Sequence, residues 1–241
     1  MFGLMVGGLL AGCSRAGEKP GGSASGGVSA SPSGSGAVSA SLESSSSLVA
    51  GGRLAVAGDY QWFRGVRDLD KGFCFVWVSK AWPALVIERM GAKELERILW
   101  QQMVGAGDGE RVSGGPLYFG VTRLDADWSL VVEDNGRLGE ADELLKALSV
   151  GSTVVCLYRA LDGRQRFLVL EDEITQLEFD PRAKVAPTGV RAGELAPVIK
   201  AVGGSGVEAG FALAERLTGV PVELSVLEES TYRFSRGPTG Q

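Results

Sequence analysis

Histidine is absent from all 241 residues of the sequence. It is the usual general base near neutral pH and the commonest metal ligand in proteins. Its absence excludes Ser-His-Asp and Cys-His catalysis, the HExxH metalloprotease motif and histidine-ligated zinc. An enzyme with this sequence would depend on carboxylates, lysine, tyrosine, or a serine or threonine activated in another way. We therefore expect a binding protein rather than an enzyme, with no cofactor and no bound metal.

Cysteine and clustered basic residues are also scarce. The three cysteines are Cys13, Cys74 and Cys156, too few for a zinc site made of four cysteine ligands. Cys74 and Cys156 fall inside predicted strands, where they either form a disulfide in an oxidising compartment or remain buried thiols. The sequence leaves that choice open. The net charge of −5 and the lack of a basic run argue against a nucleic-acid partner or an anionic lipid surface.

The first 13 residues end in a short motif with a known counterpart. Residues 1–10 are continuously apolar or small, and they run into Leu10-Ala11-Gly12-Cys13. This resembles the lipobox of bacterial lipoproteins, in which a signal segment is cut before the cysteine and the thiol carries a diacylglycerol. The resemblance implies a lipid anchor on Cys13, on the extracytoplasmic face of the cell membrane. Because no basic residue precedes the apolar run, an apolar stub with a chance cysteine is the alternative.

The next segment, residues 14–52, is rich in Ser, Gly and Ala and has few large apolar residues. Such a segment buries too little surface to offset the entropy of ordering it, so we expect a disordered tether. As a flexible coil its root-mean-square reach is roughly 30 to 36 Å. The sequence thus divides into a signal segment (1–13), a tether (14–52), one folded domain (53–230) and a frayed tail (231–241).

The folded domain is predicted to be organised around a β-hairpin. Two apolar runs, 117–121 and 128–132, flank the polar corner 123–127. Residues 73–78, FCFVWV, are β-branched and aromatic on both faces, which predicts a central strand. The other predicted strands are 153–159, 166–170 and 174–179, and the predicted helices are 83–90, 92–104, 140–148, 194–202 and 208–218. The fold class is therefore α+β, with a single antiparallel sheet (the central hairpin plus a C-terminal meander) flanked by helices.

Several short motifs in this domain resemble one family in their order and spacing. They are FCFVWV at 73–78, Trp128 with LVVE at 130–133 and Asn135-Gly136, LSVG at 148–151, FDP at 179–181, and AERLTGV at 214–220. Together they look like an actinobacterial family of uncharacterised proteins, domain of unknown function 6461. The resemblance covers roughly residues 60–224. It implies a compact α+β domain, and it brings no established activity, cofactor or catalytic residue.

The residues around the second strand of the hairpin are the main candidates for a site. Glu133 and Asp134 form either a carboxylate pair for acid/base work or cation binding, or a solvated turn before Asn135-Gly136, and we favour the turn. Trp128 lies at an element boundary, where a partly exposed ring can mark a binding face. We predict a binding face that includes Trp128, Glu133 and Asn135. Residues 203–206, GGSG, are interpreted as a loop rather than a phosphate site.

We expect the protein to be a membrane-tethered extracytoplasmic binding or interaction module, and protection against a secreted protein is one role such a module could have. Its partner would be an unknown extracytoplasmic protein or ligand. The alternative is a carboxylate-dependent hydrolase of envelope polymers, using a pair among Glu133, Asp134 and Asp180, because glycoside hydrolysis needs two carboxylates and no histidine. A third possibility is an inert envelope component, for which neither ligand nor turnover is expected.

Overall fold

The computed structural model describes residues 54–104, 115–134 and 136–239. The strands are β1 (Phe73–Ser79), β2 (Lys93–Leu99), β3 (Pro116–Arg123), β4 (Trp128–Glu133), β5 (Thr153–Arg159), β6 (Gln165–Glu171), β7 (Ile174–Phe179) and β8 (Thr231–Thr239). The α-helices are α1 (Pro83–Arg89), α2 (Trp100–Met103), α3 (Asp142–Ser149), α4 (Ala192–Val202), α5 (Val207–Thr218) and α6 (Leu224–Glu229). The 3-10 helices are η1 (Ala57–Gly65), η2 (Arg67–Leu69) and η3 (Leu138–Glu140).

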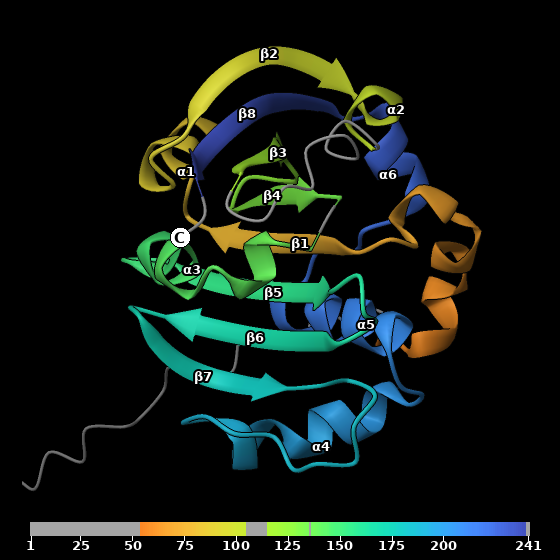
Figure 1. Ribbon diagram of the computed structural model, residues 1–241. Helices are drawn as coiled ribbons and strands as arrows, with labels where there is room; N and C mark the ends of the chain where they lie inside the picture. Colours follow the sequence, from red (N-terminus) through yellow and green to blue (C-terminus); the bar gives the residue numbers. More distant parts are fainter. Residues whose placement is uncertain (1–53, 105–114, 135, 240–241) are drawn as a thin grey trace, which may run out of the picture. The chain divides into compact units, whose positions relative to one another are not determined.

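All eight strands form one antiparallel sheet in the order β2-β8-β3-β4-β1-β5-β6-β7. Strand β1 pairs with β4 on one side and β5 on the other, and every one of its residues is buried (Figure 1). The predicted central strand, hairpin and meander are therefore confirmed. The α+β class with a single antiparallel sheet is also confirmed, although the sheet is larger than a hairpin plus a meander.

Helices cover both faces of the sheet, and each face has its own apolar core. One core joins Phe75, Trp77 and Leu157 of the sheet to η1 and α5. The other joins alternate residues of the same strands, such as Val76 and Cys156, to α1 and α3. This alternation follows from the strand period of two, by which successive side chains point to opposite faces. It explains why β1 needs apolar residues at every position.

Phe211 of α5 occupies the middle of the first core. Its ring centroid lies 5.1 Å from that of Phe75 and 5.4 Å from that of Tyr60, and it also contacts Trp77. Gly210 lets the helix come this close, because a Cβ there would lie 2.4 Å from Leu157 Cδ1. One small residue thus fixes the distance between α5 and the sheet.

The predicted helix at 92–104 is wrong over most of its length. Residues 93–99 form β2, and α2 covers only residues 100–103. Leucine and isoleucine at helical spacing suggested a helix, but the strand is defined by pairing with β8, where Lys93 lies opposite Arg236. Pairing between segments this far apart overrides local propensity. The register shift between Glu94 and Glu96 further obscures the alternation expected of a strand.

The predicted frayed tail at 231–241 is also wrong for the residues that the structure describes there. Residues 231–239 form β8, which lies between β2 and β3 inside the sheet. Gly237 suits this place because a Cβ there would lie 3.3 Å from Leu117 Cβ. Glycine and proline near the end suggested a loop, yet Tyr232 of this strand is fully buried. The domain therefore extends beyond residue 230.

No helix in the described ranges combines the length and the apolar composition needed to cross a bilayer. Cys13, the tether 14–52 and Asn135 lie outside the described residues.

Candidate functional site

The predicted binding face does not assemble around β4. Trp128 begins the strand and Glu133 ends it, so the two residues are about 17 Å apart at the usual strand rise. Trp128 is partly exposed and packs against the core that contains Phe211. Glu133 is 2% exposed and belongs to the interior. Trp128 therefore remains available to a ligand, whereas Glu133 does not share its surface.

The favoured interpretation of Glu133 and Asp134 as a solvated turn is wrong, because both residues are buried. The chain folds back after residue 134 and covers them with η3. The backbone N–H of Leu138 donates to Glu133 Oε2 at 3.2 Å. Burial raises the pKa of Glu133 to about 7, and the neighbouring charge of Asp134 adds to the rise, while backbone hydrogen bonds from Leu138 and Arg137 oppose it. The sequence predicted correctly that the chain reverses direction after β4, but it did not predict that η3 packs over Glu133 and Asp134.

The carboxylates proposed for hydrolysis are also far apart. Glu133 ends β4 and Asp180 follows β7, which is four strands away in the sheet. Four inter-strand steps amount to about 19 Å. Paired carboxylates in glycoside hydrolases lie about 5 to 9.5 Å apart. Glu133 and Asp180 therefore cannot act on one bond, and the buried Glu133 and Asp134 line neither of the cavities described below.

Cys74 and Cys156 lie on the adjacent strands β1 and β5, with their sulfur atoms 3.5 Å apart. Both are free thiols and fully buried. Burial raises the pKa of the Cys74 thiol well above its usual range, and its contact with Cys156 raises it further. A protonated, inaccessible thiol is a poor nucleophile. The pair therefore serves the core rather than chemistry in this state.

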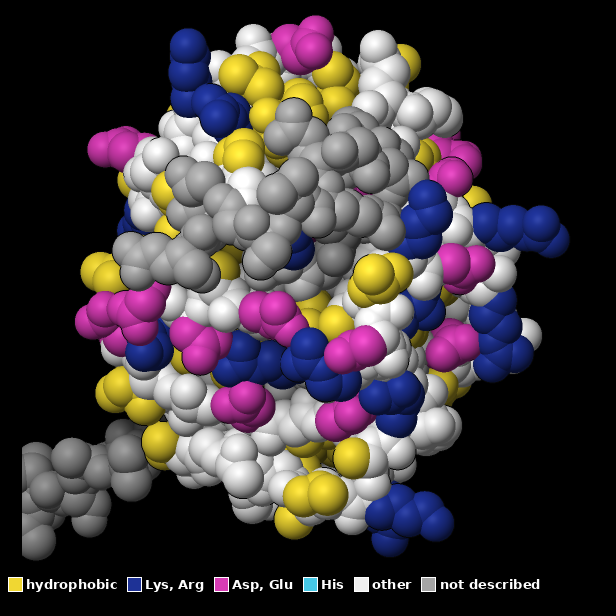
Figure 2. Space-filling view, viewed as in Figure 1, with side chains coloured by type: hydrophobic (Ala, Val, Ile, Leu, Met, Phe, Trp, Pro, Cys, Tyr) yellow, Lys and Arg dark blue, Asp and Glu magenta, His cyan; other side chains and the backbone are white. Residues whose placement is uncertain are grey.

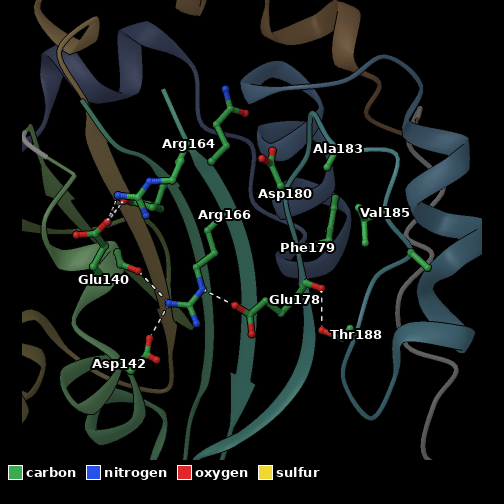
Figure 3. Close-up of a pocket in the computed structure, with 14 residues that line it drawn as sticks. Glu140, Asp142, Arg164, Arg166, Glu178, Phe179, Asp180, Ala183, Val185 and Thr188 are labelled. Carbon is green, nitrogen blue, oxygen red and sulfur yellow. Dashed lines mark hydrogen bonds and ion pairs between the residues drawn. The ribbon is translucent and has the colours of Figure 1, made fainter. Parts of the chain in front are cut away.

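The larger cavity is an open cleft of about 720 Å³ above β6 and β7. One wall comes from η3 and the start of α3, and the other from the loop 180–188 that follows β7 (Figure 3). Charged side chains line it: Glu140, Asp142, Arg164, Arg166, Glu178 and Asp180. Four carboxylates and two guanidinium groups give this lining a formal charge of −2. We call this cavity the charged cleft.

Arg166 forms the floor of the charged cleft. It donates from Nε to Glu178 Oε1 at 2.7 Å and from Nη1 to Asp142 Oδ1 at 2.6 Å. A third bond, also from Nη1, reaches the carbonyl oxygen of Gly139 at 3.0 Å. Arg166 is 20% exposed, so these partners replace most of its water. The three bonds tie β6, β7 and the η3 segment together (Figure 3).

A second ion-pair group lies beside this floor. Glu140 Oε1 accepts from the hydroxyl of Tyr158 at 2.6 Å and from Arg164 Nη2 at 2.8 Å. Burial and the Glu140 partner raise the pKa of Tyr158, so its hydroxyl stays a donor. Glu140, Asp142 and Glu178 each use one side-chain oxygen in these bonds. The second oxygen of each accepts no hydrogen bond from the residues that the structure describes.

The opposite wall of the charged cleft is apolar. Ala183, Val185 and Ala186 of the loop after β7 line it together with Phe179, and Val185 is 75% exposed. Figure 2 shows acidic and basic side chains gathered in a band across the face in view. The cleft therefore offers spare acceptor atoms on one side and an apolar surface on the other.

A smaller cavity of about 570 Å³ lies between η1 and the loop 203–206. Residues 203–206 connect α4 to α5, as the loop interpretation predicted. The one basic side chain of the described lining, Arg64, pairs with Glu208 at 2.6 Å. A phosphate there would meet no cation without an acidic partner, so the loop interpretation is retained.

Sequence reasoning named Asp180 and missed the other charged residues of the cleft. A signal was present, because Arg166 in β6 and Glu178 in β7 interrupt the apolar runs of two neighbouring strands with opposite charges. Charged pairs that face each other across a ladder indicate a polar patch on the sheet. In the described ranges, no group of three or more acidic or cysteine side chains is arranged to hold a metal ion.

Comparison with known proteins places the chain in a family without assigning it a reaction. No curated protein and no solved structure matches it. One family model, described as a family of unknown function (DUF6461), matches residues 53–240. The match includes β8 as well as every other strand of the sheet. The chain therefore belongs to the family of unknown function DUF6461.

Proposed function

We propose that this protein is a binding module whose ligand places a cationic group in the charged cleft. The observation that supports it most directly is the set of spare oxygens on Glu140, Asp142 and Glu178, beside a lining of formal charge −2. Ammonium and guanidinium groups bring several N–H donors, which match such acceptors. Because Arg166 already holds two of these carboxylates in place, the site is ordered before a ligand arrives.

The apolar wall narrows the ligand further. Lysine and arginine side chains have long aliphatic stems that pack on apolar surface while the charged head meets polar partners. Val185 and Phe179 lie where such a stem would pack, opposite the carboxylates. We therefore propose a basic segment of another protein as the ligand. This agrees with an interaction module, including one that protects against a secreted protein.

The binding test uses fluorescein-labelled peptides and the purified full-length chain. We expect fluorescence anisotropy to detect a peptide with two Arg and two Lys residues, and affinity to fall as salt rises. Glu178→Gln should weaken binding about tenfold, which corresponds to about 1.4 kcal/mol. The matched control is Glu143→Gln on α3, whose carboxylate pairs with Lys146 outside the cleft. Equal affinity for the two variants would contradict the proposal.

We propose in addition that the domain is presented outside the cell membrane by a lipid on Cys13 and the tether 14–52. Support comes from Leu10-Ala11-Gly12-Cys13 followed directly by a segment of flexible composition. Cells expressing the chain should incorporate labelled palmitate into it, and a Cys13→Ser variant should lose the label and leave the membrane fraction. Label that persists in the variant would exclude this anchor.

A further inference from the structure

Trp82 is a large aromatic residue that the fold holds at the surface. It precedes α1, and 64% of its surface is exposed. Its ring lies over the guanidinium of Arg123, with 4.0 Å between the Arg123 Cζ atom and the ring centroid. A cation over an exposed ring contributes about 0.5 to 1 kcal/mol, enough to restrict the orientation of the ring. We call Lys80, Ala81, Trp82 and Arg123 the Trp82 corner.

Arg123 is held by neutral acceptors. Its Nη1 donates to the carbonyl oxygen of Ala81 at 3.0 Å and to Ser129 Oγ at 3.2 Å, and its Nη2 donates to the carbonyl oxygen of Ala126. No carboxylate in the described part of the chain forms an ion pair with it. Its Nε is buried without a hydrogen-bond partner there. Within the described residues the guanidinium of Arg123 therefore contacts no carboxylate, and neither Asp125 nor Asp127 of the same hairpin corner forms an ion pair with it.

The backbone of this corner is strained. Lys80 has a φ of 54°, in the left-handed region that glycine usually occupies, and its N–H donates to the carbonyl oxygen of Asp127 at 2.7 Å. A non-glycine residue in this conformation costs on the order of 1 kcal/mol or more. Ser129 Oγ also donates to the carbonyl oxygen of Ala81 at 2.6 Å, which fixes the segment from below. Strain and an unpaired buried donor both tend to persist where function requires them.

We infer that the Trp82 corner docks an acidic segment of a partner protein, with an apolar side chain on the Trp82 ring and a carboxylate near Arg123 and Lys80. Tryptophan and arginine are the residues most often found at the energetic centre of protein interfaces. Lys80 is exposed and adds a second positive charge. Charge complementarity therefore selects a carboxylate-bearing partner.

Two acidic residues of the neighbouring turn, Asp125 and Asp127, weaken the attraction of the Trp82 corner for an acidic segment. Asp125 Oδ1 accepts the backbone N–H groups of Asp127 and Trp128, both at 2.7 Å, which fixes that carboxylate in its own turn while it keeps its negative charge. The side chain of Asp127 is exposed and accepts no hydrogen bond from a described residue. Asp127 should therefore repel an acidic partner, and its removal should tighten binding.

The Trp82 corner is separate from the charged cleft. It follows the end of β1, which lies beside the start of β5 and the end of β6. The cleft lies at the other end of these strands, around the start of β6 and the end of β7. In Figure 1 β1 ends at the left of the view and β6 begins at the right. The two sites also differ in the charge of the ligand that each selects.

The test is fluorescence anisotropy with a labelled acidic peptide, GELEELEG, and its uncharged counterpart, GQLQQLQG, against the full-length chain. We expect the acidic peptide to bind, at concentrations up to millimolar, at least tenfold more tightly than the uncharged one. Trp82→Ala and Arg123→Met should each weaken binding about tenfold, whereas Trp82→Phe should retain most of it. Asp127→Asn should tighten binding about twofold.

The control variant is Glu143→Gln on α3, which lies outside both sites and should leave acidic-peptide binding unchanged. Failure of the wild-type chain to bind the acidic peptide overturns the inference, and so does equal binding of both peptides. Circular dichroism of each variant separates loss of the site from loss of the fold. If Arg123→Met unfolds, Trp82→Ala decides the matter, because its ring is largely outside the core.

Discussion

Arg166 and Arg123 are two arginines of one sheet that meet very different partners. Arg166 lies between the carboxylates of Asp142 and Glu178 in the charged cleft. Arg123 lies among carbonyl and hydroxyl oxygens and under the ring of Trp82. The charge of Arg166 is neutralised by its two carboxylate partners. The charge of Arg123 has no carboxylate in contact among the described residues. The surroundings of an arginine, rather than its presence, thus decide whether its charge is available to a partner.

The difference also assigns the two regions different ligands. The cleft around Arg166 is lined by more carboxylates than guanidinium groups, so some carboxylate oxygens are left to accept hydrogen bonds from a ligand. Around Arg123 the described acceptors are neutral, so what remains is positive charge. Four predictions sharpen or break this comparison, and they are ordered by the size of the expected effect.

The largest effect is expected at Glu133, a buried carboxylate that forms no ion pair with a described residue. In contrast to Asp142 and Glu178, it shows how burial changes the pKa of a carboxylate that has no guanidinium partner. Its pKa is raised in the folded state, so the folded chain binds the extra proton. The contribution of Glu133 to stability should therefore be fully present below about pH 4.5 and should be lost as the pH rises through 7, by roughly 3 kcal/mol in total.

Glu133→Gln should remove this dependence and make the chain more stable than wild type at pH 8.5. Urea denaturation at pH 5 and pH 8.5 measures both effects. Identical pH profiles for wild type and variant would show that Glu133 is not the titrating group.

Arg166→Met should reduce the free energy of unfolding by about 2 kcal/mol, because it leaves Asp142 and Glu178 without their shared donor. Arg164→Met is the matched control, since its side chain is 64% exposed and surface ion pairs contribute about 0 to 1 kcal/mol. Urea denaturation compares the two. Equal losses would mean that the Arg166 pairs are no stronger than surface pairs.

Arg123→Met should cost about 1 kcal/mol, the typical net contribution of hydrogen bonds to neutral acceptors. Because these acceptors carry no charge, the loss should be the same at 50 mM and 500 mM salt, whereas the loss from Arg166→Met should shrink with salt. A salt-dependent Arg123 loss would reveal a carboxylate partner and would end the contrast between the two arginines.

Trp82→Ala should change the free energy of unfolding least, by about 0.5 kcal/mol, because the ring is mostly exposed and loses only its contact with Arg123. Thermal denaturation of the variant checks this. A loss above about 2 kcal/mol would mean that the ring is a core element rather than a surface anchor.

Local patterns predicted the parts of the fold that local sequence determines. The run FCFVWV gave β1 because a strand covered on both faces needs apolar residues throughout. The hairpin β3–β4 followed from two apolar runs around a polar corner. Strand β2 was missed because its pairing is with β8, where Lys93 lies opposite Arg236, and β8 was missed because it pairs with the distant strands β2 and β3. No window of neighbouring residues contains that information.

The site was harder to predict for the same reason. Glu133 and Asp134 have the sequence of a solvated turn, and their burial depends on η3 returning over them. The charged cleft draws on η3, α3, β5, β6 and the loop after β7, so its residues are adjacent only in the folded chain. The contact of Trp82 with Arg123 was also out of reach, because it depends on the register of β3 against β4.

The position of β8 has a consequence for synthesis of the chain. β8 follows every other element in sequence, yet it separates β2 from β3 in the sheet. Until residues 231–239 have left the ribosome, β3 has one neighbour and β2 has none, so the sheet cannot be completed before then. Chains interrupted before residue 231 would expose two unpaired edges, which favour aggregation. A complete sheet therefore forms only when residues 231–239 are present. Chains that lack them would be more accessible to proteases.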